Sequence, residues 1–356
     1  MAAPKQSARA NGSERIDRSE YMKRVHRFRN LVVYVLIGSI AVFLGISIVF
    51  GGINKVAGEI GSINLWIYSL AFACVFASYL VRFGKWSFYL RTLKVRISWW
   101  ESFSIYMSLG SMNITPGRVG RILGGYTLEK VSGKKFMTVA PAITMDIFAD
   151  FLGFAFFAGI TAILFHKFVV YILFIIVLLS ISFWVVLDDR FYRWLSKGRG
   201  GIFKRFTPHA NMYFRSQGAL NKRWIYAFSF AYTLPADFLN SLALYFTLLA
   251  FGIHPSLGVV IFIFATAHIF GMASFVPGSI GVTDVMIVIM SEAAFGISSA
   301  MSAAVAILTR FATLWFVVGL GALFLFYTMR YWTNAKAKKV KNALAETKAD
   351  ERKIKT

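Results

Sequence analysis

The segment Ser274-Phe275-Val276-Pro277-Gly278-Ser279-Ile280-Gly281 interrupts an apolar stretch that runs from 256 to 297. A second segment, Asn113-Ile114-Thr115-Pro116-Gly117-Arg118-Val119-Gly120, interrupts the apolar stretch 98–130. We call 113–120 break 1 and 274–281 break 2. Proline removes a backbone donor and glycine tolerates unusual dihedral angles, so each break should end one helix and begin another. Unpaired backbone at membrane depth must be shielded by protein or line a wet cavity, so two breaks predict an interior polar cavity.

The composition places these breaks in a membrane protein. Apolar residues make up 57% of the 356 residues and charged residues only 15%, whereas soluble domains carry about 25% charged residues. This excludes a water-soluble enzyme. Apolar runs of about 20 residues can cross a bilayer as helices. We therefore expect an all-α polytopic bundle with two re-entrant or broken hairpins and about six full spans, at 31–53, 63–82, 137–165, 168–187, 224–252 and 300–328.

Basic residues indicate how the chain is oriented, because short cytoplasmic loops collect Lys and Arg. The chain has 39 Lys+Arg against 16 Asp+Glu, a net charge of +23. The basic residues gather in 1–30, 82–96, 130–135, 188–223 and 329–356, whereas the opposite loops hold only Lys55 and Lys167. This pattern predicts a multi-pass protein of the cell (inner) membrane with both termini cytoplasmic, and it explains the charge without a nucleic-acid partner.

Three regions follow from this layout. Residues 1–30 should form a disordered, basic cytoplasmic arm, 31–328 a single membrane domain and 329–356 a basic tail. The cytoplasmic loop 188–223 interleaves basic and aromatic side chains, which suits contact with an anionic lipid surface; positive-inside bias alone would explain the charges but not the aromatic residues. The run 31–53 is too long for a cleaved signal and is expected to be a retained span.

The two breaks resemble each other. Gly110, Pro116, Gly117 and Gly120 recur as Gly271, Pro277, Gly278 and Gly281 at a constant offset of 161 residues. The basic loops give the two copies opposite orientations. This pattern predicts an inverted-topology repeat, which is typical of transporters that bind substrate near the midplane.

Ionisable residues inside apolar segments are costly to insert and are usually functional. Asp146 and Asp150 lie one helical turn apart and share a face. The expected intramembrane charge network consists of Asp146, Asp150, Asp237 and Arg310. Arg118 and Arg121 stand where a half-helix should begin, and its positive dipole end together with two arginines would bind phosphate. The expected substrate-binding residues are Asn113, Thr115, Pro116, Gly117, Arg118, Gly120, Arg121, Pro277, Gly278, Gly281 and Asp284.

Structural roles compete with these functional ones. Arg118 and Arg121 could instead extend to the cytoplasmic interface, and Arg310 could pair with Asp146, Asp150 or Asp284. Asp237 and Glu292 could be solvated at segment ends, and His268 fits a hydrogen-bonded helix–helix contact better than a ligand. No nucleotide-binding loop, zinc cluster or hydrolase motif occurs, so we expect no catalytic residue, metal or cofactor and no enzyme activity.

Break 1, followed by the helix of Asp146 and Asp150, and the stretch 275–284, followed by Arg310, resemble the lysylphosphatidylglycerol synthase transmembrane region, also called the flippase-like family. The resemblance covers about residues 31–330. It implies a membrane protein that moves or handles lipids, without the synthetase domain of two-domain relatives. Three features depart from the family pattern. Arg121 stands where relatives often have an acidic residue, and Asp284 stands where they have a glutamate. Relatives tend to have Glu-Arg before the helical aspartate, whereas this chain has Met145-Asp146 there.

The sequence thus favours a protein that binds and translocates a lipid or lipid-linked anionic substrate. Two other classes stay open. One is a non-transporting membrane partner that presents lipid to an envelope biosynthetic enzyme; the other is an integral membrane lipid transferase.

Overall fold

A bundle of long apolar helices forms the protein. The computed structural model describes residues 34, 37–38, 40–50, 52–115, 120–165, 177, 212–328 and 330. Within these residues every regular element is helical, which confirms the predicted all-α membrane bundle. The predicted arm 1–30, nearly all of the span 168–187, residues 188–211 of the basic loop and nearly all of the tail 329–356 lie outside the described residues.

Five helical segments of the described chain are long and apolar enough to span a membrane. They are α3 (Leu65–Thr92), the Phe136–Ile163 part of α7 (Phe136–Phe165), α11 (Arg223–Ala250), Pro277–Phe295, and Ser299–Thr328. The fourth segment contains α13 (Val282–Phe295). The sequence pattern predicted a re-entrant hairpin for the segment Pro277–Phe295, but this segment is long enough to be a span. The last segment comprises α14 (Ser299–Arg310), a π-helical turn η4 (Phe311–Trp315) and further helix to Thr328.

α3 corrects the predicted boundary of the second span. The Asn64 side chain accepts hydrogen bonds from the backbone N–H groups of Trp66 and Ile67 and caps its N-terminus. The helix then continues to Thr92 instead of ending near residue 82. The reason is that no proline interrupts 82–92 and the aromatic residues there bury against the bundle, so Arg82 and Lys85 are carried inside with them. The prediction that these two cations lie in a cytoplasmic loop is wrong.

The first predicted span also differs from the sequence expectation. Residues 40–49 are helical, but α2 (Ile53–Gly61) follows at an angle of 103°. Gly52 lies between them with φ of 86°, a value that glycine adopts without steric cost. The chain therefore turns sharply where the run 31–53 was expected to end.

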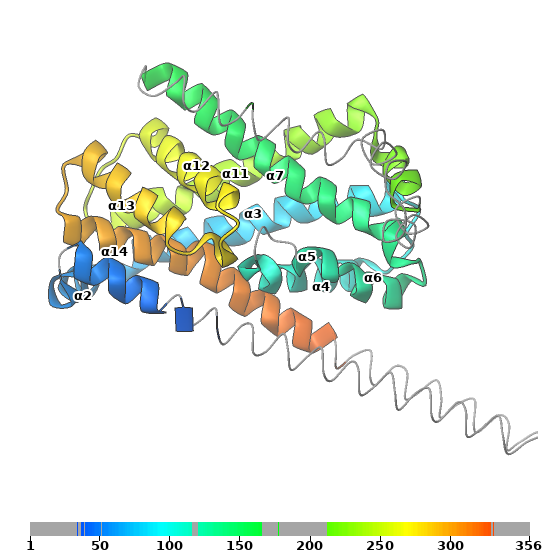
Figure 1. The fold of residues 1–356 in the computed structure, drawn as a ribbon, viewed down its shortest axis with the longest axis horizontal. Helices are drawn as coiled ribbons and strands as arrows, with labels where there is room; N and C mark the ends of the chain where they lie inside the picture. The colour runs from blue at the N-terminus through cyan, green and yellow to red at the C-terminus, as the bar shows by residue number, and fades with distance from the viewer. Residues whose placement is uncertain are drawn as a thin grey trace, which may run out of the picture.

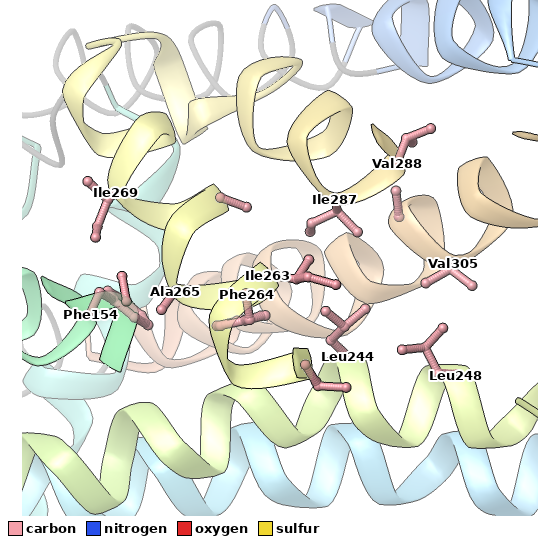
Figure 2. Close-up of a cluster of buried hydrophobic side chains, with 14 of the residues drawn as sticks. Phe154, Leu244, Leu248, Ile263, Phe264, Ala265, Ile269, Ile287, Val288 and Val305 are labelled. Atoms are coloured by element: carbon pink, nitrogen blue, oxygen red, sulfur yellow. The ribbon is translucent and has the colours of Figure 1, made fainter. Parts of the chain in front are cut away.

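The long helices lie along one another (Figure 1). α3 and α11 run side by side through the centre, α7 (green) lies along one edge of the view and α14 (orange) along the opposite edge. α12 (Leu257–Ala273) packs against α7, α11 and α13. Figure 2 shows buried side chains of these helices pointing toward one another, among them Phe154, Leu244, Phe264 and Val305. This apolar cluster fixes the helices that carry the polar residues described below.

Both breaks end one helix and begin another, as predicted. Around break 1, α4 (Trp99–Leu109) passes into a 3₁₀ turn, η1 (Gly110–Ile114), and the chain resumes as α5 (Gly120–Leu123) and α6 (Gly125–Ser132). Around break 2, α12 ends at Ala273, a short 3₁₀ turn η3 (Pro277–Ser279) follows, and α13 begins at Val282. The inverted orientation of the two copies stays a prediction.

Candidate functional site: a polar cavity between the breaks

The two breaks meet inside the bundle. η1 contacts η3, and Ile114 of break 1 packs with Ile280 of break 2 against Leu314 and Val318. The helix that follows η4 packs closely on η1: a Cβ atom at Gly321 would lie 2.3 Å from the backbone nitrogen of Ser111. A residue without a side chain is required there so that the two backbones can approach.

A cavity of about 50 Å³ lies beside this junction. At about 10–15 Å³ for each water, it holds a few water molecules. Its polar lining comes from seven α-helices, the turn η4 and both breaks and consists of Tyr79, Arg82, Tyr106, Asn113, Arg121, Asp150, Asn240, His268, Ser279, Arg310 and Thr313. Three guanidinium groups therefore face one small interior space, which fulfils the sequence-based expectation of a polar cavity at the breaks.

On one side of the cavity lies a cluster of six charged residues, which we call the central charge cluster: Arg82, Lys85, Arg121, Asp146, Asp150 and Asp237. All six side chains are buried. Lys85 Nζ lies 3.0 Å from Oδ1 of Asp146, 3.0 Å from Oδ1 of Asp150 and 2.9 Å from Thr233 Oγ1. Lys85 thus joins α3 to α7 and α11 through two hydrogen bonds, to Asp150 and Thr233, and an ion pair with Asp146.

The two arginines of the cluster each face two carboxylates. Arg82 pairs with both Asp150 and Asp237, and its Nε donates to Ser78 Oγ at 3.2 Å. Arg121 Nη2 lies 2.5 Å from Asp146 Oδ2, and its Nη1 lies 3.9 Å from Asp150 Oδ2. Asp150 is thus the carboxylate that all three cations of the cluster share.

A second ion pair holds break 2 on the other side. Arg310 Nε lies 3.0 Å from Asp284 Oδ1, and Arg310 Nη2 donates to the carbonyl oxygen of Gly278 at 2.5 Å. The Asp284 Oδ2 atom in turn accepts a hydrogen bond from the backbone N–H of Gly281 at 2.7 Å. Gly278, Ser279 and Gly281 all have positive φ values, which cost energy at Ser279 because it carries a side chain. Arg310 and Asp284 hold this turn in place.

Several polar atoms at the cavity have no hydrogen-bond partner among the described residues. They are Oδ1 of Asn113, Oδ1 of Asn240, the Tyr106 hydroxyl and Nε of Arg121. Buried polar atoms are normally paired with protein or water. The cavity therefore offers both donors and acceptors to water or to a polar headgroup.

The comparisons with known proteins agree with this architecture. Residues 31–321 match the family described as "Lysylphosphatidylglycerol synthase TM region". The chain belongs to this family. Residues of the chain are also 28% identical over 136 positions to a UPF0104 membrane protein of Methanothermobacter thermautotrophicus. That match covers 38% of this chain and 37% of the relative. The chain is accordingly a multi-pass membrane protein of the lysylphosphatidylglycerol synthase transmembrane family.

For this family member, the structure brings together most of the residues singled out from the sequence. Asp146, Asp150 and Asp237 lie in the central charge cluster, and Asp284 and Arg310 lie at break 2. Asp237 is fully buried, so the alternative of a solvated position is wrong. Arg310 pairs with Asp284, whereas Asp146 contacts Lys85 and Arg121. Glu292 accepts a hydrogen bond from Ser299 Oγ at 2.9 Å and is half-buried.

Break 1 corrects part of the sequence interpretation. Arg121 is 5% exposed and ion-paired inside the bundle, so the alternative of an interfacial side chain is wrong for it. Arg121 is the second residue of α5, and α5 has only four residues, too few to supply a helix dipole for phosphate. Thr115 Oγ1 accepts a hydrogen bond from the N–H of Gly120 at 2.7 Å. The predicted site residues Pro116, Gly117 and Arg118 lie outside the described residues.

Asn113 and His268 line the cavity in structural roles. Asn113 Nδ2 donates to the Tyr79 hydroxyl at 2.7 Å. His268 Nδ1 lies 2.9 Å from the carbonyl oxygen of Phe264 in its own helix, and its ring stacks on Phe154 of α7 with the ring centroids 5.0 Å apart. His268 thus contacts a second helix by ring stacking, whereas its hydrogen bond to Phe264 stays within α12.

Arg82 and Lys85 are the functional candidates that the sequence analysis missed. A signal for them existed: 82–90 continues the apolar run with five aromatic or leucine residues and no proline. The spacing of three also places both cations on one helical face. Counting them as loop charges hid this pattern.

Proposed function

We propose that this protein binds the anionic headgroup of a lipid, or of a lipid-linked substrate, in the cavity between the breaks and translocates it across the cell membrane. The observation that carries the proposal is the convergence of Arg82, Arg121 and Arg310 on one buried cavity. Guanidinium groups bind phosphate through paired hydrogen bonds. The family to which the chain belongs supports a role connected with membrane lipids.

The ion pairs supply a means of changing state. A lipid headgroup exceeds the volume of a few waters, so it enters only if arginines leave their carboxylates and the breaks move apart. In that step the headgroup phosphate replaces Asp150 on Arg82 and Arg121, and Arg310 releases Gly278. Binding energy then opens one side of the cavity while the apolar cluster around α12 keeps its packing, as an alternating-access cycle requires.

A flux assay tests the proposal. The purified protein is reconstituted in vesicles that contain a fluorescent, headgroup-intact phosphatidylglycerol, and dithionite bleaches the label in the outer leaflet. With translocation, bleaching proceeds beyond the outer-leaflet fraction. Arg121→Gln should lower the rate at least tenfold. The matched control Arg91→Gln, at an exposed position of α3, should leave the rate unchanged.

Equal rates in the Arg121→Gln, Arg91→Gln and protein-free vesicles would overturn the proposal of translocation. Binding of the labelled lipid without any flux would favour the alternative role of a membrane partner that presents lipid to an envelope enzyme. A covalently altered lipid after incubation would identify a transferase.

A further inference from the structure

The wall of the cavity has a charged part and a neutral polar part. The charged part consists of Arg82, Arg121, Arg310 and Asp150. The neutral part includes Tyr106 on α4 and Asn240 on α11, which approach the cavity from different helices. The proposed function uses the arginines for a phosphate and leaves the neutral part without a role.

The neutral part keeps hydrogen-bonding atoms in reserve. The Tyr106 hydroxyl and the Oδ1 atom of Asn240 have no hydrogen-bond partner among the described residues. Oδ1 of Asn113 is also without one, although its Nδ2 donates to the Tyr79 hydroxyl. Buried polar atoms are normally paired with protein or water. A ligand that enters the cavity can therefore pair with these atoms without breaking a hydrogen bond of the described chain.

Packing holds Tyr106 in place. Its side chain is 1% exposed, and its ring centroid lies 5.6 Å from that of Trp86, 6.0 Å from that of Phe83 and 6.4 Å from that of Tyr79. A phenylalanine would fill the same space without burying an unpaired hydroxyl, which is unfavourable. The hydroxyl is thus fixed beside the cavity before any ligand binds, and a ligand that pairs with it has little ordering cost to meet.

Alcohol groups fit the neutral part best. An alcohol both donates and accepts a hydrogen bond, so it can pair with a tyrosine hydroxyl and with either end of an amide. An ammonium group only donates, and it would enter a wall in which three guanidinium groups stand beside one carboxylate, Asp150. That carboxylate is already ion-paired with Arg82 and Lys85. The wall therefore favours hydroxyl groups and disfavours a further cation.

We propose that the cavity selects headgroups in which the phosphate is esterified to a polyol, such as glycerol or a cyclic polyol. The guanidinium groups bind the phosphate, and Tyr106 and Asn240 bind hydroxyl groups of the polyol. Both residues line one cavity of about 50 Å³, so a single headgroup reaches both. This inference rests on the proposed function and specifies the substrate class. Headgroups that end in an amine, such as phosphoethanolamine, bind poorly.

A matched series of lipids tests the preference. The detergent-solubilised full-length protein is titrated calorimetrically at pH 7 with dihexanoyl lipids, and empty micelles supply the blank. Phosphatidylglycerol and phosphatidylpropanol carry the same charge and the same three-carbon alcohol, and they differ only in the two free hydroxyls. Because each lost hydrogen bond weakens binding several-fold, phosphatidylglycerol should bind about tenfold more tightly or better. Phosphatidylinositol should share this advantage, whereas phosphatidylethanolamine should not bind more tightly than phosphatidylpropanol.

Two variants assign the preference to residues. Tyr106→Phe removes one hydroxyl, and Asn240→Leu replaces the amide by an apolar side chain of similar size. Each should lower the affinity for phosphatidylglycerol about three- to tenfold and change that for phosphatidylpropanol less than about twofold. A merely structural role would weaken the binding of both lipids alike. Tyr232→Phe, at an exposed position of α11 outside the cavity lining, is the matched control and should keep the native preference.

Glycerophosphoglycerol, the same headgroup without acyl chains, separates a lipid from a soluble polyol phosphate. It should bind much more weakly than phosphatidylglycerol. Binding of equal strength would support the hydroxyl preference but overturn the lipid substrate of the proposed function.

The remaining outcomes distinguish the two proposals. If none of the anionic lipids binds to the native chain, the proposed function fails and this inference fails with it. If the two polyol lipids bind no more tightly than phosphatidylpropanol, the inference is overturned and the proposed function stands. Equal weakening of both lipids by Tyr106→Phe and by Asn240→Leu would also overturn it. If Tyr106→Phe does not fold, the native preference and Asn240→Leu decide the question.

Discussion

Arg310 on α14 donates a hydrogen bond to the carbonyl oxygen of Gly278 in break 2 at 2.5 Å. This contact ties the last long helix to a turn with strained backbone angles, and the same guanidinium lies 3.0 Å from Asp284 at the start of α13. The π-helical turn Phe311–Trp315 begins at the next residue. Such turns occur often at functional sites, where one extra residue in a helical turn re-aims a side chain.

Arg310→Gln should destabilise the protein and stop lipid movement. The substitution leaves Asp284 charged and buried without its cation, and breaking a buried pair in this way costs about 3–5 kcal/mol. Thermal unfolding in detergent and the dithionite assay measure the two effects. The double variant Arg310→Gln/Asp284→Asn should recover much of the stability but not the flux. Arg330→Gln, at an exposed position, is the control; an Arg310→Gln protein with native stability would contradict the role given to this pair.

Lys85→Met should lower the free energy of unfolding by about 3–5 kcal/mol. The ammonium group of Lys85 contacts Asp146, Asp150 and Thr233, and its removal leaves two carboxylates short of a cation. Lys94→Met removes an exposed cation just beyond the end of α3 and should change stability by less than about 1 kcal/mol. Chemical unfolding followed by tryptophan fluorescence compares the two, and equal effects would refute the buried bridge.

Gly321→Ala should destabilise by about 1–3 kcal/mol through overpacking. The added Cβ would lie 2.3 Å from the Ser111 nitrogen and 2.9 Å from the Met107 carbonyl oxygen, both backbone atoms that cannot rotate away. Gly319 lies two residues earlier on the same helix and would meet no atom within 4 Å. Gly319→Ala should therefore be neutral or stabilise by up to about 1 kcal/mol. Thermal unfolding of both variants tests how closely this helix packs on the end of α4 and on η1.

Single cysteines should report the orientation predicted from the basic loops. In a Cys74→Ala background, Lys55→Cys on α2 should react with a membrane-impermeant maleimide in intact cells, because Lys55 is exposed and the basic loops predict that it lies on the side opposite to them. Lys94→Cys should react only after the cells are opened. The reverse labelling pattern would place the termini outside the cytoplasm.

Particular residues show how far the sequence could be interpreted. The breaks and the helices on either side were predictable because proline and glycine act locally. Proline removes a backbone donor and glycine permits unusual dihedral angles, and both effects are independent of the surrounding structure. Asp146 and Asp150 were predictable as a pair because helical periodicity alone puts them on one face. Arg82 and Lys85 were assigned wrongly because a cation near the end of an apolar run has the same local signature in a loop and in a buried helix.

The sequence by itself determined that the chain is a helical membrane protein, where its helices break, and that Asp146 and Asp150 share one helical face. These properties follow from local composition, hydropathy and backbone stereochemistry. Only the tertiary structure decided which cation meets which carboxylate: Asp146 contacts Lys85 and Arg121, while Arg310 contacts Asp284 and Gly278. Ion pairing depends on distances of a few ångströms between helices far apart in the chain, and those distances are set by packing across the whole bundle.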